Sequence, residues 1–195
     1  MNREQFLRYN TTLQGISLIA APIVLLSSTI FFYLGGNMDS DDVGGVLQIL
    51  AFFFFIFAVL GLTELLGSTN PREAITLRVL LVFGSVYGAI NGLSSVLADK
   101  ANGGISSLPN GLAQLLVFPG ILFPLSLAVI GLVLWRKGLV AAPVGIALSL
   151  GGLLFPVGRI PDIVILYFVA DVLLIFSMGW IGLQMLNKRG NRLKG

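Results

Sequence analysis

Cysteine and histidine are both absent from the 195 residues of the chain, and only 11% of the residues are charged. Without these two residue types the chain has no disulfide, no thiolate nucleophile and no imidazole base. The side chains that most often bind zinc, haem iron and iron–sulfur clusters are missing as well. We therefore expect no enzyme activity, no metal site and no cofactor.

The scarcity of charge also argues against a water-soluble globular domain. Such domains carry roughly a quarter charged residues, whereas 56% of this chain is hydrophobic. Polar side chains are too few to cover an apolar core, so we expect lipid to surround the protein. The formal net charge is +3, but the cations lie in short segments between apolar runs. Anionic lipid headgroups are therefore the expected partners of these cations, and nucleic acid is not.

Six long apolar runs predict the fold. Each has about 19 to 24 residues, which lets a helix rising 1.5 Å per residue cross a hydrocarbon core of about 30 Å. We predict an all-α, polytopic integral membrane protein with six transmembrane helices in one bundle. Residues 1–12 are predicted to be a cytoplasmic segment, with a short interfacial helix as one interpretation, and residues 187–195 a basic cytoplasmic tail. The predicted spans are 13–34, 46–66, 74–97, 113–135, 139–157 and 163–186.

The positive charges predict how the chain crosses the membrane. Ten of the twelve Lys and Arg residues lie in or beside every second gap between the runs, counting both tails. Membrane insertion retains loops rich in Lys and Arg in the cytoplasm, so both termini are predicted to be cytoplasmic. The expected location is a bacterial-type cytoplasmic membrane. Lys100 and Arg159 are the two exceptions, and both are predicted on the outer side.

Asp171 is the main candidate for a functional residue. It lies about eight residues into the sixth run, roughly 12 Å from the outer end. An acid at the centre of a membrane helix costs about 2.5–3.5 kcal/mol, so we expect Asp171 to face the interior of the bundle. Asn91 is predicted at a similar depth in the third run, and Arg159 at the outer end of the fifth run is within reach of Asp171.

These residues suggest a ligand-binding pocket in the outer half of the bundle. The hypothesis is that Asp171, Asn91 and Arg159 line it, with Tyr87 and Tyr167 as its walls. The alternative is an interhelical hydrogen bond or ion pair that only fixes the bundle. Nearer the inner side, Glu64 and Arg78 flank a short turn and are predicted to form a structural ion pair.

Two rows of small residues recur at spacings of three or four positions in the third and fifth runs. This spacing places them on one helix face, so a neighbouring helix can approach closely. The expected role is packing within the bundle, and the alternative is docking of another membrane protein or a second copy. The rows are Gly84, Gly88 and Gly92, and then Ala141, Gly145, Ser149 and Gly152.

Two functions remain open from the sequence. The first is non-enzymatic binding or transport of a small molecule, cationic or lipophilic, through the polar pocket around Asp171. The second is a structural or regulatory membrane subunit that docks a partner through its glycine-rich helix faces. An interior filled by side chains, with an exposed glycine face, would favour the second function.

Overall fold

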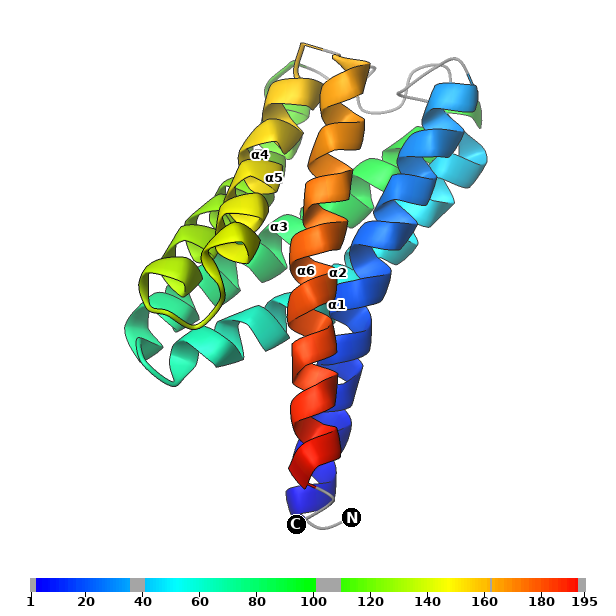
Figure 1. Cartoon of the computed structure of the whole chain (residues 1–195). Helices are drawn as coiled ribbons and strands as arrows, with labels where there is room; N and C mark the ends of the chain where they lie inside the picture. Colours follow the sequence, from blue (N-terminus) through cyan, green and yellow to red (C-terminus); the bar gives the residue numbers. More distant parts are fainter. Residues whose placement is uncertain (1–2, 36–40, 101–109, 162, 193–195) are drawn as a thin grey trace.

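The computed structural model describes residues 3–35, 41–100, 110–161 and 163–192, and their side chains except at 3–4, 6–8, 98–100, 110–119 and 188–192. In these residues all regular structure is helical, so the predicted all-α class with six helices is confirmed (Figure 1). The helices are α1 (Arg3–Leu34), α2 (Asp42–Gly67), α3 (Pro71–Lys100), α4 (Asn110–Arg136), α5 (Ala142–Arg159) and α6 (Val164–Arg192).

The helices form a closed ring. Each helix packs on the next one in the chain, and α6 returns to pack on α1. Figure 1 shows α1 and α6 side by side, with both ends of the chain together at one end of the molecule. Because consecutive helices run in opposite directions, the α2–α3 and α4–α5 turns lie toward that end. We call it the inner end, and the opposite end, with the α5–α6 connection, the outer end.

Five of the helices are long and apolar enough to cross a membrane. In α4, the part with described side chains, Gly120–Arg136, is apolar but shorter. Large apolar side chains also point away from the bundle: Phe53 is 59% exposed and Ile165 is 70% exposed. The outside of the bundle is therefore apolar along with its core. The five long helices comprise Tyr9–Leu34, Asp42–Gly67, Pro71–Leu97, Ala142–Arg159 and Val164–Asn187.

The first helix begins earlier than the predicted first span, and the last helix ends later than the predicted sixth span. Residues 3–12 continue into α1 without a break, so they do not form a separate interfacial helix. At the other end α6 continues to Arg192, into the predicted basic tail. Gly15 and Gly182 explain how the two helices stay together here, since a β carbon on Gly182 would lie only 2.7 Å from the Gly15 carbonyl oxygen. The close backbone contact aligns the inner halves of α1 and α6.

Local sequence signals place several helix ends. Asp41 caps α2, because its side chain accepts a hydrogen bond from the backbone N–H of Gly44. Pro71 is the first residue of α3, a position that suits its fixed φ and its lack of a backbone N–H. After α4, Gly138 has a φ of 67°, and its N–H bonds to the Trp135 carbonyl while that of Leu139 bonds to Leu134. This is a Schellman motif, which ends the helix at a left-handed glycine.

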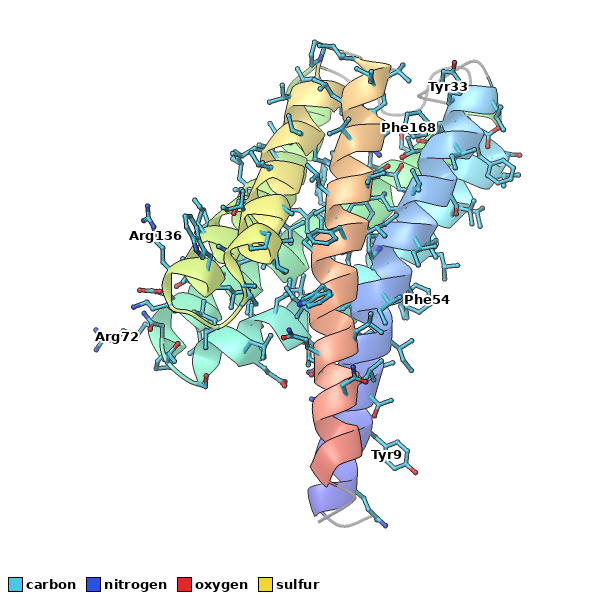
Figure 2. All side chains as sticks on the ribbon, viewed as in Figure 1. Tyr9, Tyr33, Phe54, Arg72, Arg136 and Phe168 are labelled. Atoms are coloured by element: carbon cyan, nitrogen blue, oxygen red, sulfur yellow. The ribbon has the colours of Figure 1, made fainter. Side chains whose placement is uncertain are left out.

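Three phenylalanines hold the centre of the bundle. Phe123 of α4 meets Phe52 and Phe55 of α2 edge to face, with ring centroids 5.2 and 4.9 Å apart. Edge-to-face pairs at this distance are favourable beyond the area that they bury. They connect α2 with α4 across the ring. Nearer the outer end, Tyr33 of α1 and Phe168 of α6 make a similar contact, with centroids 6.0 Å apart (Figure 2).

The glycine row of α3 lies against neighbouring helices of the same chain. A β carbon on Gly84 would come within 2.8 Å of the Phe123 backbone, and one on Gly88 would overlap the Phe52 ring. A β carbon on Gly92 would lie 2.8 Å from the Gly45 carbonyl oxygen. Helices α2 and α4 therefore occupy this face.

The second row lies between α5 and α4. A β carbon on Gly145 would meet Trp135, and one on Gly152 would lie 2.6 Å from the Ala128 nitrogen. Ser149 is buried, and its hydroxyl donates to the Ala128 carbonyl at 2.9 Å. Ala141 is different, since it is the exposed N-cap residue of α5. The rest of the row packs within the bundle.

Candidate functional site

Asp171 lies in the interior of the bundle with no exposed surface. It is on α6, near the outer end. Thr29 of α1 donates a hydrogen bond from Oγ1 to Asp171 Oδ2 at 2.7 Å. The Leu25 carbonyl is a second acceptor for the same hydroxyl, at 3.2 Å. The carboxyl group of Asp171 therefore joins α6 to α1.

Arg159 extends from the end of α5 to the same place. Its Nη2 donates to Thr29 Oγ1 at 3.3 Å, and its charge interacts with the carboxyl group of Asp171. Helices α5 and α1 are not neighbours in the ring, so this long side chain bridges them past α6. We call Thr29, Arg159 and Asp171 the outer polar cluster.

Two aromatic rings flank the guanidinium group. The Cζ atom of Arg159 lies 4.3 Å from the ring centroid of Phe155 and 5.4 Å from that of Tyr167. Both distances are within the range in which a cation is attracted to a ring face. Phe155 lies one turn before Arg159 on α5, and Tyr167 one turn before Asp171 on α6. The rings therefore restrict the guanidinium to the neighbourhood of the carboxyl group.

Two polar atoms of the outer polar cluster have no hydrogen-bond partner among the described residues. They are the Oδ1 atom of Asp171, which accepts, and the Nε atom of Arg159, which donates. Burying an unpaired polar group costs about 1–3 kcal/mol, and more when the group is charged. Most buried polar groups in proteins are therefore satisfied by the protein or by a bound molecule, most often an ordered water. The cluster offers one acceptor and one donor to such a molecule.

The structure brings together only part of the predicted pocket. Asp171, Arg159 and Tyr167 meet at the outer polar cluster. Asn91 instead lies on an exposed face of α3, and α3 makes no contact with α6 in the described part of the chain. Tyr87 is buried on α3, where it faces α4 near Gly120. Neither Asn91 nor Tyr87 is therefore part of the site around Asp171.

The predicted ion pair at the inner end is replaced by other contacts. Arg78 donates from Nε to Thr63 Oγ1 at 2.9 Å. The carboxylate of Glu64 accepts from Asn10 Nδ2 at 3.3 Å. Within the described contacts, Glu64 and Arg78 are not paired with each other. The two residues still have structural roles, because each joins α2 to a neighbouring helix.

Thr29 is the residue of the cluster that sequence reasoning misses. A threonine in an apolar run commonly bonds to the carbonyl four residues earlier, so its presence in α1 predicts no tertiary contact. The signal that could have found it is the pattern of buried positions on α1. Ser28 and Thr29 follow Leu18, Ala21 and Leu25 on the face that packs into the core.

The chemistry that this arrangement offers is hydrogen bonding by a hydroxyl, a carboxyl group and a guanidinium. The outer polar cluster joins three helices and has one unpaired donor and one unpaired acceptor. Thr29 and Asp171 are fully buried in it, and Arg159 is partly exposed. No protein-family model matches the chain, and comparison with curated proteins and with solved structures likewise found no match.

Proposed function

We propose that the chain is an integral membrane protein that binds a small, uncharged, hydrogen-bonding molecule at the outer polar cluster. The observation that carries this proposal is the pair of unpartnered buried atoms, Asp171 Oδ1 and Arg159 Nε. An ionised acid beside an ionised guanidinium has no net charge. This favours an alcohol or amide group over the cationic ligand that an isolated Asp171 would suggest.

The surface of the bundle supports membrane insertion, and we propose that the membrane is a bacterial-type cytoplasmic one. Five helices are long and apolar enough to cross a bilayer, and their outward faces carry large apolar side chains. The charges support an orientation with both termini in the cytoplasm. Arg72 near the α2–α3 turn and Arg136 at the α4–α5 turn project from the same side of the molecule (Figure 2), and cationic loops stay inside.

The orientation can be tested directly, because the chain has no cysteine of its own. Ser68 and Ile160 are exposed at the α2–α3 turn and the α5–α6 connection. We expect Ile160→Cys to react with a membrane-impermeant maleimide in intact cells, and Ser68→Cys only after permeabilisation. The reverse result would show that the termini lie outside.

A docking role through the glycine rows has less support. The glycines of both rows contact α2 or α4 of the same chain. These two helix faces are therefore already covered and are not available to a partner. A membrane-protein partner or a second copy would have to use another surface. Lipids remain the expected neighbours of the outward faces, since apolar side chains predominate there.

The binding proposal is tested with the purified wild-type protein and with Asp171→Asn. We expect mass spectrometry of extracts from mild detergent to find an uncharged small molecule with the wild type, and at least about tenfold less with the variant. An amide in place of the acid changes one acceptor of the cluster but keeps its shape. Ser177→Ala, on the same helix and away from the cluster, is the control and should retain the molecule.

The same Asp171→Asn variant distinguishes binding from a structural role. If the carboxyl group serves mainly to bind, the melting temperature after removal of small molecules should fall by only a few degrees. The weakened hydrogen bond contributes about 1 kcal/mol, and the partly exposed Arg159 can extend its guanidinium to water. A large fall of the melting temperature, with nothing bound to the wild type, would show that the cluster only fixes the bundle.

A further inference from the structure

A second group of unpaired polar atoms lies on α1, nearer the inner end. Gln14 has no exposed surface, yet neither its Nε2 nor its Oε1 has a hydrogen-bond partner among the residues that the structure describes. Ser17, one turn along the same helix face, is equally buried, and its hydroxyl also lacks a described partner. The amide nitrogen of Gln14, which donates, its amide oxygen, which accepts, and the hydroxyl of Ser17 therefore belong to one buried face of α1.

The surroundings of Gln14 locate this place at the junction of three helices. A β carbon on Gly61 of α2 would lie 3.1 Å from Gln14 Cβ and 3.5 Å from Met185 Cε of α6. The side chain of Gln14 thus starts where α1, α2 and α6 meet. Gly15 and Gly182 cross beside it without side chains between them. Because these neighbouring residues are small and apolar, Gln14 and Ser17 supply the polar groups of the junction.

We propose that Gln14 and Ser17 form a second binding site for the same class of molecule, an uncharged group that both donates and accepts hydrogen bonds. An amide and a hydroxyl are the complementary chemistry, because they recognise alcohols and amides without a charge. This inference rests on the proposed function, since it extends one binding site to two along the same helix.

The two sites are separated along α1 by apolar side chains. From Ser17 to Thr29 is twelve residues, or about 18 Å along a helix. Leu18, Ala21 and Leu25 lie between them on the buried face. One site is therefore in each half of the bundle, with an apolar segment between, and the interface of α1 and α6 connects them.

Single cysteines test the second site, since the native chain has none. Ser17→Cys is compared with Ser177→Cys as a matched control. Ser177 is also fully buried, but its hydroxyl donates to the Leu173 carbonyl at 2.7 Å. The probes are methyl methanethiosulfonate, which is uncharged, and its ethylammonium and ethylsulfonate analogues. Only a thiol that ionises in a polar, accessible environment reacts with them.

We expect Ser17→Cys to react with the uncharged probe at least about tenfold faster than Ser177→Cys. At Ser17→Cys the charged probes should react more slowly than the uncharged probe. Each rate is divided by the rate of the same probe at the exposed Ser68→Cys. Equal rates for Ser17→Cys and Ser177→Cys would overturn the second site. A preference for either charged probe would overturn the ligand class.

Thr29→Cys, treated in the same way, separates this proposal from the proposed function. If the wild type retains a molecule and Ser17→Cys is unreactive, the second site is wrong and the outer site stands. If Ser17→Cys reacts and Thr29→Cys does not, the outer site is wrong.

Gln14→Leu supplies an independent measurement, because removing an unpaired amide should leave the melting temperature unchanged or raise it. A fall of several degrees would show that the amide is already bonded within the protein.

Discussion

Gly152→Ala is expected to lower the melting temperature of the detergent-solubilised protein, whereas Gly179→Ala should leave it unchanged or raise it. A β carbon on Gly152 would lie 2.6 Å from both the Ala128 nitrogen and the Pro124 carbonyl oxygen. These are backbone atoms of α4, so the helices must separate to admit a methyl group. Overpacking of this kind costs about 1–3 kcal/mol, or about 2–10 °C for a chain of this length.

Gly179 is the matched control for this substitution. It lies inside α6, and a β carbon there would have no atom within 4 Å. Alanine in a helix is favoured over glycine by about 0.5–1 kcal/mol, because glycine loses more backbone entropy on folding. Circular dichroism during heating measures both variants. If the two variants melt at the same temperature, α4 and α5 are not in the close contact that the structure gives them.

The sequence predicts which residues form helices better than it predicts which helices pack against each other. Six apolar runs are separated by short polar segments, and each run becomes one helix because its backbone groups can bond only within it when lipid is outside. The helix ends are less predictable. Residues 3–12 read as a separate segment because they are polar, yet they extend α1, since no proline or glycine interrupts the helix there.

The candidate site shows the same limit. Asp171 is predicted to face inward because the cost of a lipid-facing acid outweighs other effects, and it has no exposed surface. Asn91 is predicted to belong to the same site from its depth alone. Depth gives the height of a residue along the bundle, whereas a contact also requires neighbouring helices. The ring order separates α3 from α6, and periodicity in one sequence does not contain that order.

Arg159→Met should produce a larger loss of stability than Gly152→Ala, because it leaves the carboxyl group of Asp171 buried without its charge partner. Leaving a buried charge without its partner typically costs 3–5 kcal/mol, roughly 10 °C in melting temperature here. Methionine keeps most of the apolar stem that packs against Phe155. The loss is therefore expected to come from the charge more than from packing. An unchanged melting temperature would show that Arg159 and Asp171 are not coupled.

The double variant Arg159→Met with Asp171→Leu should recover most of that loss. Replacing both members of a buried pair by apolar side chains is often neutral or stabilising. The hydroxyl of Thr29 remains satisfied in this variant, because the Leu25 carbonyl is within 3.2 Å. Both effects are measured by thermal unfolding of the two single variants, the double variant and the wild type, which form a complete mutant cycle.

The double variant then separates stability from binding. If the outer polar cluster binds a molecule, the double variant melts near the wild-type temperature but no longer retains that molecule in mass spectrometry. The wild type and the double variant are then similarly stable and differ only in whether they retain the molecule. Instability therefore cannot account for the loss of the molecule. If the double variant keeps the molecule, the ligand lies elsewhere, and Gln14 with Ser17 becomes the first place to look. If neither protein holds a molecule while the double variant is stable, the three polar residues serve only to join α1, α5 and α6.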